Sequence, residues 1–89
     1  MGIQRTKSGR KNLVGLKLHE LREAKGMSQR DLEKAFQLIG YDIDQNVITR
    51  LETGRRKMTD MDMFAMMKVF EVTANELLES ELMEEIFER

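Results

Sequence analysis

Three oxygen-bearing side chains alternate in the segment DIDQN, where Asp42, Asp44 and Asn46 occupy every second position. This spacing matches the start of a calcium loop, whose first, third and fifth residues supply ligands. Such a loop also needs Gly at its sixth position and Glu at its twelfth, but these positions hold Val47 and Thr53. Because a β-branched residue does not readily adopt the glycine conformation, the segment does not predict a calcium site.

The other candidate clusters also lack the residues of a catalytic or metal site. His19 is the single histidine, so the segment HELRE has no second His for a zinc protease, and His19 is expected to be an exposed helix residue. Ser28 and Ser80 have no cysteine, histidine or glycine-rich elbow around them. The absence of cysteine excludes a disulfide framework and a thiolate metal site. We therefore expect neither an enzyme nor a cofactor.

A polar helix face followed by cations gives a clearer chemical signal. The residues after Asp44 have helical spacing, with Val47, Ile48 and Leu51 on the inner side. The outer side is polar and holds Gln45, Asn46, Thr49 and Arg50. Asn and Gln side chains pair with adenine and Arg pairs with guanine, so such a face suits the major groove of DNA. Arg55, Arg56 and Lys57 follow directly and suit phosphates, although an ordinary solvated face is the alternative.

The charges divide between the two parts of the chain. Residues 1–58 hold 13 Lys and Arg against 7 Asp and Glu, a surplus of 6 positive charges, while residues 59–89 hold 2 against 9, a surplus of 7 negative charges. A basic front is the electrostatic footprint of nucleic-acid binding, and an acidic back keeps the second part away from phosphates. Two solvated surfaces without a partner are the alternative.

Helical periods and caps organise the chain into one small all-α domain. Five helices are predicted, over residues 13–25, 29–39, 44–53, 61–70 and from 73 toward the C-terminus. The expected inward residues outside the third helix are Val14, Leu18, Leu21, Leu32, Ala35, Phe36, Ile39, Phe64, Met67 and Phe70. Ser28, Asp44 and Thr59/Asp60 have the places of N-caps, Thr73 and Glu76 form a capping box, and Gly26, Gly40 and Gly54 end helices.

Two terminal segments are expected to flank this domain. Residues 1–12 are glycine-rich and basic, which predicts a flexible arm that orders only against a partner and adds phosphate contacts from Arg10 and Lys11. Residues 80–89 are expected to form a helical extension. An apolar stripe there exceeds what a small core needs and is expected to be a dimer contact, made by Leu78, Leu82, Met83, Ile86 and Phe87. The eight methionines are expected to fill the core rather than line a binding groove.

The segments LREAKGMSQRDL, VITRLETGRRK and TDMDMFAMMKVFEVTANELL together resemble the phage-repressor and Cro-like helix-turn-helix family, often called XRE. The resemblance covers roughly residues 13–79 and implies a lambda-repressor-like five-helix bundle. It implies that Gln29 contacts a phosphate and that Arg22 pairs with Glu52 to hold two helices in register. The base-reading positions map onto Gln45, Asn46, Thr49 and Arg50, and the backbone-contacting loop maps onto Arg55, Arg56 and Lys57.

The chain departs from the family pattern between the second and third helices. Glu33 and Gln37 stand where the family usually has Ala and a tight-turn Gly, and Gly40 follows three residues later. The connection GYDI is therefore longer than usual, and Tyr41 is expected to pack under it, with a contact to the DNA backbone as the alternative.

The resemblance implies a function in transcription. We expect a cytoplasmic homodimer that binds a double-stranded DNA operator with two-fold symmetry, with the helix over residues 44–53 in the major groove, and that acts as a repressor. The sequence predicts neither a membrane span nor a signal peptide. Two alternatives remain open: an antitoxin that also binds a toxin, and a protein-interaction module that has lost DNA binding.

Overall fold

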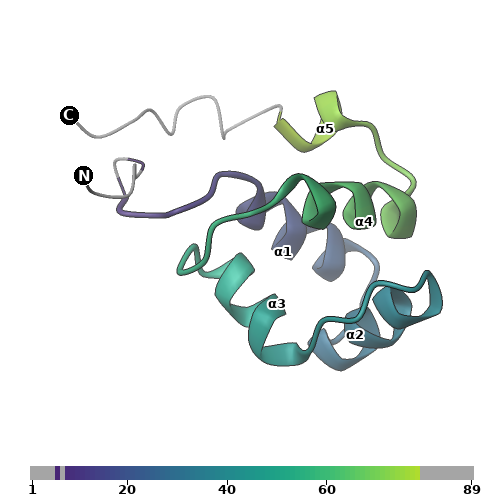
Figure 1. The fold of residues 1–89 in the computed structure, drawn as a ribbon. Coiled ribbons are helices and arrows are strands. Elements are labelled where there is room, and N and C mark those ends of the chain that lie inside the picture. Colours follow the sequence, from purple (N-terminus) through teal and green to yellow (C-terminus); the bar gives the residue numbers. More distant parts are fainter. Residues whose placement is uncertain (1–5, 7, 79–89) are drawn as a thin grey trace.

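Five α-helices form the part of the chain that this computed structural model describes, which comprises Thr6 and residues 8–78 (Figure 1). They are α1 (Val14–Ala24), α2 (Gln29–Leu38), α3 (Gln45–Glu52), α4 (Asp60–Phe70) and α5 (Ala74–Leu78). Helix α1 contacts α3, α4 and α5, while α2 packs against α3 and α4. The expected all-α, five-helix architecture is confirmed, and the starts of the helices lie close to the predicted positions.

Side-chain caps fix the starts of α2 to α5. The carboxylate of Asp44 accepts a hydrogen bond from the Val47 amide at 2.9 Å, which satisfies one of the free N–H groups at the start of α3. At the other three starts, a Ser or Thr hydroxyl and an acidic side chain three residues later each accept from the other's amide. The four cap residues are Ser28, Asp44, Thr59 and Thr73. Each was predicted from the local sequence.

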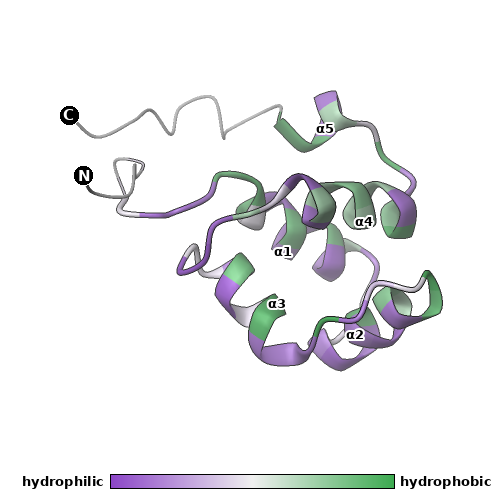
Figure 2. Cartoon of the chain, in the orientation of Figure 1, coloured by the Kyte–Doolittle hydropathy of each residue, from purple (hydrophilic) through white to green (hydrophobic). Residues whose placement is uncertain are grey.

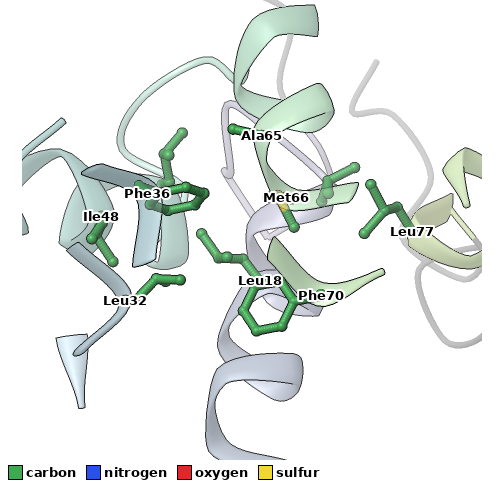
Figure 3. Close-up of a cluster of buried hydrophobic side chains, with 10 residues drawn as sticks. Leu18, Leu32, Phe36, Ile48, Ala65, Met66, Phe70 and Leu77 are labelled. Carbon is green, nitrogen blue, oxygen red and sulfur yellow. The ribbon is translucent and has the colours of Figure 1, made fainter. Parts of the chain in front are cut away.

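The hydrophobic core draws on every helix (Figure 3). Leu18, Leu32 and Ile48 are fully buried, and they join the face of α1 to those of α2 and α3. From the other side, α4 and α5 add apolar side chains, among which Met66 is fully buried, and Met27, Met58, Met63 and Met67 pack against the core. These five methionines fill the core as expected, but Met61 is 65% exposed, so the expectation was wrong for Met61. The core consists of Val14, Leu18, Leu32, Phe36, Ile48, Leu51, Ala65, Met66, Phe70 and Leu77.

Two residues that were predicted to face inward do not. Ile39 is 44% exposed because α2 ends at Leu38 and the chain leaves the helical period there. Phe64 is 60% exposed because α4 turns the neighbouring pair Ala65 and Met66 into the core instead. The inward predictions for these two residues were wrong.

The N-terminal segment is also more closely attached than predicted. Residues 10–12 were assigned to an arm that orders only against a partner, yet all three contact the folded core. Asn12 is buried, and the Lys11 amide donates to the Gly54 carbonyl at 2.8 Å. Thr6, farther up the predicted arm, is also buried, and its amide donates to the Arg10 carbonyl at 3.0 Å. The rest of the arm, residues 1–5 and 7, and the C-terminal residues 79–89 lie outside the described residues.

Candidate nucleic-acid interface

The outer face of α3 presents the four side chains that the sequence assigned to base reading. Asn46, Thr49 and Arg50 are exposed and Gln45 is half-buried, while Ile48 and Leu51 on the opposite side belong to the core. Figure 2 shows the start of α3 and much of α2 as hydrophilic ribbon. The burial pattern follows directly from the 3.6-residue helical period, which separates an apolar from a polar face.

Three cations follow α3 and stay close to its end. Gly54 ends the helix with φ at +78°, a conformation that glycine adopts without strain. The Arg55 and Arg56 amides then donate back to the Arg50 carbonyl at 2.9 and 3.3 Å. The side chains of Arg55 and Lys57 are exposed and that of Arg56 is half-buried. Within the described residues, neither these three cations nor Arg50 forms an ion pair.

The buried carboxylate of Glu52 joins α1 to the last turn of α3. Its side chain is only 5% exposed. Arg22 Nε donates to Oε2 at 2.7 Å and Arg22 Nη2 donates to Oε1 at 3.1 Å, so the guanidinium grips both oxygens. Arg22 also donates through Nη1 to the Met27 carbonyl at 2.8 Å, which fixes the turn before α2. Arg22 therefore ties α1 both to the last turn of α3 and to the turn before α2.

Two further side chains converge on the same carboxylate. Gln29 Nε2 donates to Glu52 Oε1 at 3.2 Å, and His19 Nδ1 lies 3.1 Å from the same oxygen. His19 was expected to be merely exposed, and its side chain is 47% exposed, but it takes part in this network. The sequence signal was available in its spacing, since His19 and Arg22 are three residues apart and share one face of α1.

The network determines the charge state of Glu52. Burial opposes ionisation, but the hydrogen bonds from Arg22, His19 and Gln29 outweigh it, so the pKa of Glu52 lies below its ordinary value. The hydrogen bond to Glu52 raises the pKa of Arg22. Glu52 is therefore a carboxylate at neutral pH and can only accept hydrogen bonds.

Gln29 links this network to the outer face of α3. Its Oε1 accepts a hydrogen bond from the Thr49 hydroxyl at 3.0 Å, while its Nε2 donates to Glu52. Gln29 was predicted to contact a phosphate, and the second hydrogen of its amide has no acceptor among the described residues. The structure thus brings a predicted phosphate contact and a predicted base contact together.

The segment before α1 satisfies the carbonyl groups at the end of α3. Arg10 Nη2 donates to the Glu52 carbonyl at 2.8 Å, and Asn12 Nδ2 donates to the carbonyls of Leu51 and Arg56 at 3.0 and 2.7 Å. A helix end leaves such carbonyls without partners inside the helix, so both side chains act as C-terminal caps from a distant segment. Asn12 was not singled out from the sequence, and Arg10 was expected to contact phosphate instead.

Lys11 lies at the same end of α3. The hydrogen bond from its amide to the Gly54 carbonyl places it near Arg55, and both residues border a hollow of about 380 Å³. Leu78, which was assigned to a dimer contact, lies in α5, on the far side of α1 from α3 (Figure 1). The other four residues of that contact lie outside the described residues.

The long connection between α2 and α3 is held by Tyr41. Its ring packs edge-on against Phe36, with 5.9 Å between the ring centroids, and its hydroxyl donates to the buried carboxylate of Asp62 in α4. Burial, followed by this hydrogen bond, raises the pKa of Tyr41. The expectation that Tyr41 packs under the connection is confirmed by these contacts.

The described residues contain no group of three or more His, Cys, Asp or Glu side chains arranged to hold a metal ion. None of the described helices combines the length and the apolar character that crossing a membrane requires.

Comparison with known proteins gives the family. A family model described as helix-turn-helix matches residues 18–77, which is more than half of the 89-residue chain. This match agrees with the phage-repressor and Cro-like resemblance and spans α2, α3 and the Glu52 network. No curated protein and no solved structure matches the chain. The chain belongs to the helix-turn-helix family of DNA-binding transcription regulators.

Proposed function

We propose that this chain binds a specific double-stranded DNA operator with α3 in the major groove. The observation that carries the proposal is the outer face of α3, where four polar side chains precede cations that have no ion-pair partner among the described residues. Cations held in a surface network of ion pairs would be poorly available for phosphate. Unpaired ones are ready to replace the counterions of DNA.

The proposal divides the side chains into two roles. Those on α3 face the edges of the bases, and they are Gln45, Asn46, Thr49 and Arg50. Those around it contact phosphates and fix the register of the helix, and they are Gln29, Lys11, Arg55, Arg56 and Lys57. Arg10 acts indirectly, because its guanidinium holds the end of α3 from which the phosphate-binding cations project.

We further propose a homodimer that acts as a repressor. Leu78 is exposed on α5, on the far side of α1 from α3, so a contact there leaves both copies of α3 uncovered (Figure 1). Two copies related by a two-fold axis would read half-sites about one helical turn apart, ~34 Å. Occupying an operator is sufficient to block access to it, which favours repression as the direction of regulation.

Selection of bound duplexes from random DNA tests this function. The expected result is a consensus of two inverted half-sites whose centres are about one turn apart. A matched control is the variant Arg50→Ala/Asn46→Ala, which retains the phosphate-binding cations and should enrich DNA weakly and without a consensus. Failure of the native chain to enrich any sequence would refute the proposed function.

A second candidate function is that of an antitoxin, which would also bind a protein toxin. The exposed apolar side chains of Ile39, Met61 and Phe64 favour this second function. They line a hollow of about 690 Å³ whose lining includes no residue of α3, so a protein could bind there without covering α3. Co-expression with the product of a small adjacent reading frame is the test. Growth arrest by that product, relieved by the native chain but not by Phe64→Glu, would support the antitoxin; equal relief by both would count against this surface.

A further inference from the structure

Whether the Thr49 hydroxyl donates or accepts a hydrogen bond determines which groups it can pair with. A hydroxyl group has one hydrogen to donate and lone pairs to accept with, so in isolation it pairs with either kind of group on a base edge. In this chain Thr49 is not isolated, because a series of hydrogen bonds connects it through Gln29 to Glu52.

The series begins at a group that can only accept. Glu52 is nearly buried and receives two hydrogen bonds from Arg22 at 2.7 and 3.1 Å, which stabilise its ionised form. Its Oε1 lies 3.2 Å from the amide end of Gln29. A carboxylate oxygen repels the amide oxygen of a neighbour, so the side chain of Gln29 must present its NH₂ group to Glu52.

This orientation of the amide determines the next bond. With its NH₂ turned toward Glu52, Gln29 turns its Oε1 outward to Thr49, whose hydroxyl lies 3.0 Å away. An amide oxygen accepts only, so the single hydroxyl hydrogen of Thr49 points at Gln29. The lone pairs of the exposed Thr49 oxygen are left for a partner in solution.

We infer that Thr49 acts on DNA as a hydrogen-bond acceptor and selects adenine or cytosine, the bases with an amino group in the major groove, on the strand it faces. This inference rests on the proposed entry of α3 into the major groove. Adenine offers its N6 amino group and cytosine its N4 amino group, whereas guanine and thymine offer oxygen acceptors there. Gln29, Glu52 and Arg22 are then positioning residues that determine specificity without touching the base.

A comparison of selected consensus sequences tests the inference. The position that Thr49 faces is the one whose base preference changes in Thr49→Val, which lacks the hydroxyl at nearly unchanged volume. In the native chain, adenine and cytosine should be preferred over guanine and thymine at that position by about threefold to tenfold, the range expected for one hydrogen bond. Thr49→Ser retains the hydroxyl and should retain the preference.

The decisive variant is Gln29→Met, which keeps the length of the side chain but removes both polar ends. It frees the Thr49 hydroxyl to rotate and donate, so the preference at that one position should fall to less than about twofold while the other positions keep theirs. Loss of the Gln29 phosphate contact lowers affinity for all sequences equally and leaves this ratio unchanged. A thermal unfolding curve would verify that the variant is folded.

The outcomes separate the inference from the function on which it rests. A preference for guanine or thymine at that position, or an unchanged ratio in folded Gln29→Met, would overturn the acceptor role while leaving operator binding intact. If neither the native chain nor any variant enriched a consensus, the proposed function and this inference would fail together. Loss of the preference in Thr49→Val and Gln29→Met, with retention in Thr49→Ser, would support the inference.

Discussion

Gly15 in α1 lies directly against the carbonyl oxygen of Leu51 in α3, so closely that a Cβ atom on Gly15 would overlap that oxygen. The same carbonyl accepts a hydrogen bond from Asn12, whose Oδ1 in turn accepts from the Gly15 amide at 2.8 Å. The backbones of α1 and α3 therefore meet without an intervening side chain. This contact sets the depth at which α3 is seated on α1.

Substitution of Gly15 by Ala is expected to destabilise the fold strongly. The new methyl group meets backbone, which cannot rotate away, so α3 must move outward at a cost of about 1–3 kcal/mol or more. Urea unfolding monitored by circular dichroism measures this cost. Ala24→Gly, a change of the same size at the exposed last residue of α1, is the control and should cost less than the roughly 0.5–1 kcal/mol of a Gly inside a helix. A Gly15→Ala variant as stable as the native chain would contradict this close packing.

Replacement of Glu52 by Gln is expected to remove a pH-dependent part of the stability. Because burial is outweighed by hydrogen bonds, the pKa of Glu52 in the fold lies below the ordinary value of 4.5. Its stabilisation is therefore complete above that value and is lost as the pH falls through the lower pKa of the folded state. At pH 7 the variant should be less stable by about 2–3 kcal/mol.

Denaturant unfolding of both proteins between pH 7 and pH 3 checks this prediction. The difference in unfolding free energy between the native chain and the Glu52→Gln variant should be constant from pH 7 to about 5 and should shrink below the ordinary value of 4.5. A difference that stays constant down to pH 3 would show that folding does not lower the pKa of Glu52.

Replacement of Arg50 by Ala is expected to affect sequence discrimination. Its side chain is exposed and has no ion-pair partner among the described residues, so removing it should leave stability within about 0.5 kcal/mol of the native value. Affinity for the selected operator should fall by about 1–3 kcal/mol, with relaxed preference at one base pair. Fluorescence anisotropy with the operator and with random duplex measures both effects. Equal weakening on both duplexes would indicate a phosphate contact instead.

Replacement of Lys57 by Ala is expected to weaken binding to all duplexes alike. A lost phosphate contact reduces the number of counterions released, so the slope of log affinity against log salt concentration should become shallower by about 1. Lys68→Ala is the matched control, because Lys68 lies exposed on α4 over the Phe64 ring. If Lys68→Ala changed the slope of log affinity against log salt concentration and Lys57→Ala did not, the phosphate contact would lie on α4 and not at the end of α3.

Replacement of Tyr41 by Phe tests how the long connection is held. The change removes the donor to the buried carboxylate of Asp62, which retains its bond from the Thr59 amide at 3.0 Å. The expected cost is about 1–3 kcal/mol in the unfolding free energy. A double-mutant cycle with Asp62→Asn should show coupling between the two side chains, and strictly additive effects would exclude a shared bond.

Much of the fold was predictable because its signals are local. Caps such as Asp44 and Thr73 act on amides three residues away, and apolar spacing marks the inner face of each helix. The two wrong inward predictions, Ile39 and Phe64, both come from apolar residues at the margin of a helical face. At such positions the neighbouring helices decide which side chain is covered.

The candidate site was predictable only in outline. The outer face of α3 follows from helical geometry, and its exposure agrees with the sequence pattern. The spacing of His19 and Arg22 places both on one face of α1. The sequence did not indicate that this face and Gln29 of α2 would meet on the Glu52 carboxylate of α3, because that depends on how the three helices pack.

The sequence by itself determined the five helices, the capped starts of α2 to α5 and the polar face of α3, since each depends on interactions within a few residues. Only the tertiary structure decided how deep α3 sits against Gly15, which side chains cap its end and which way Thr49 directs its hydroxyl. These features join residues such as Asn12 and Arg56, 44 positions apart. Such residues meet only when the packing of the core brings their helices together, because no local rule of spacing relates them.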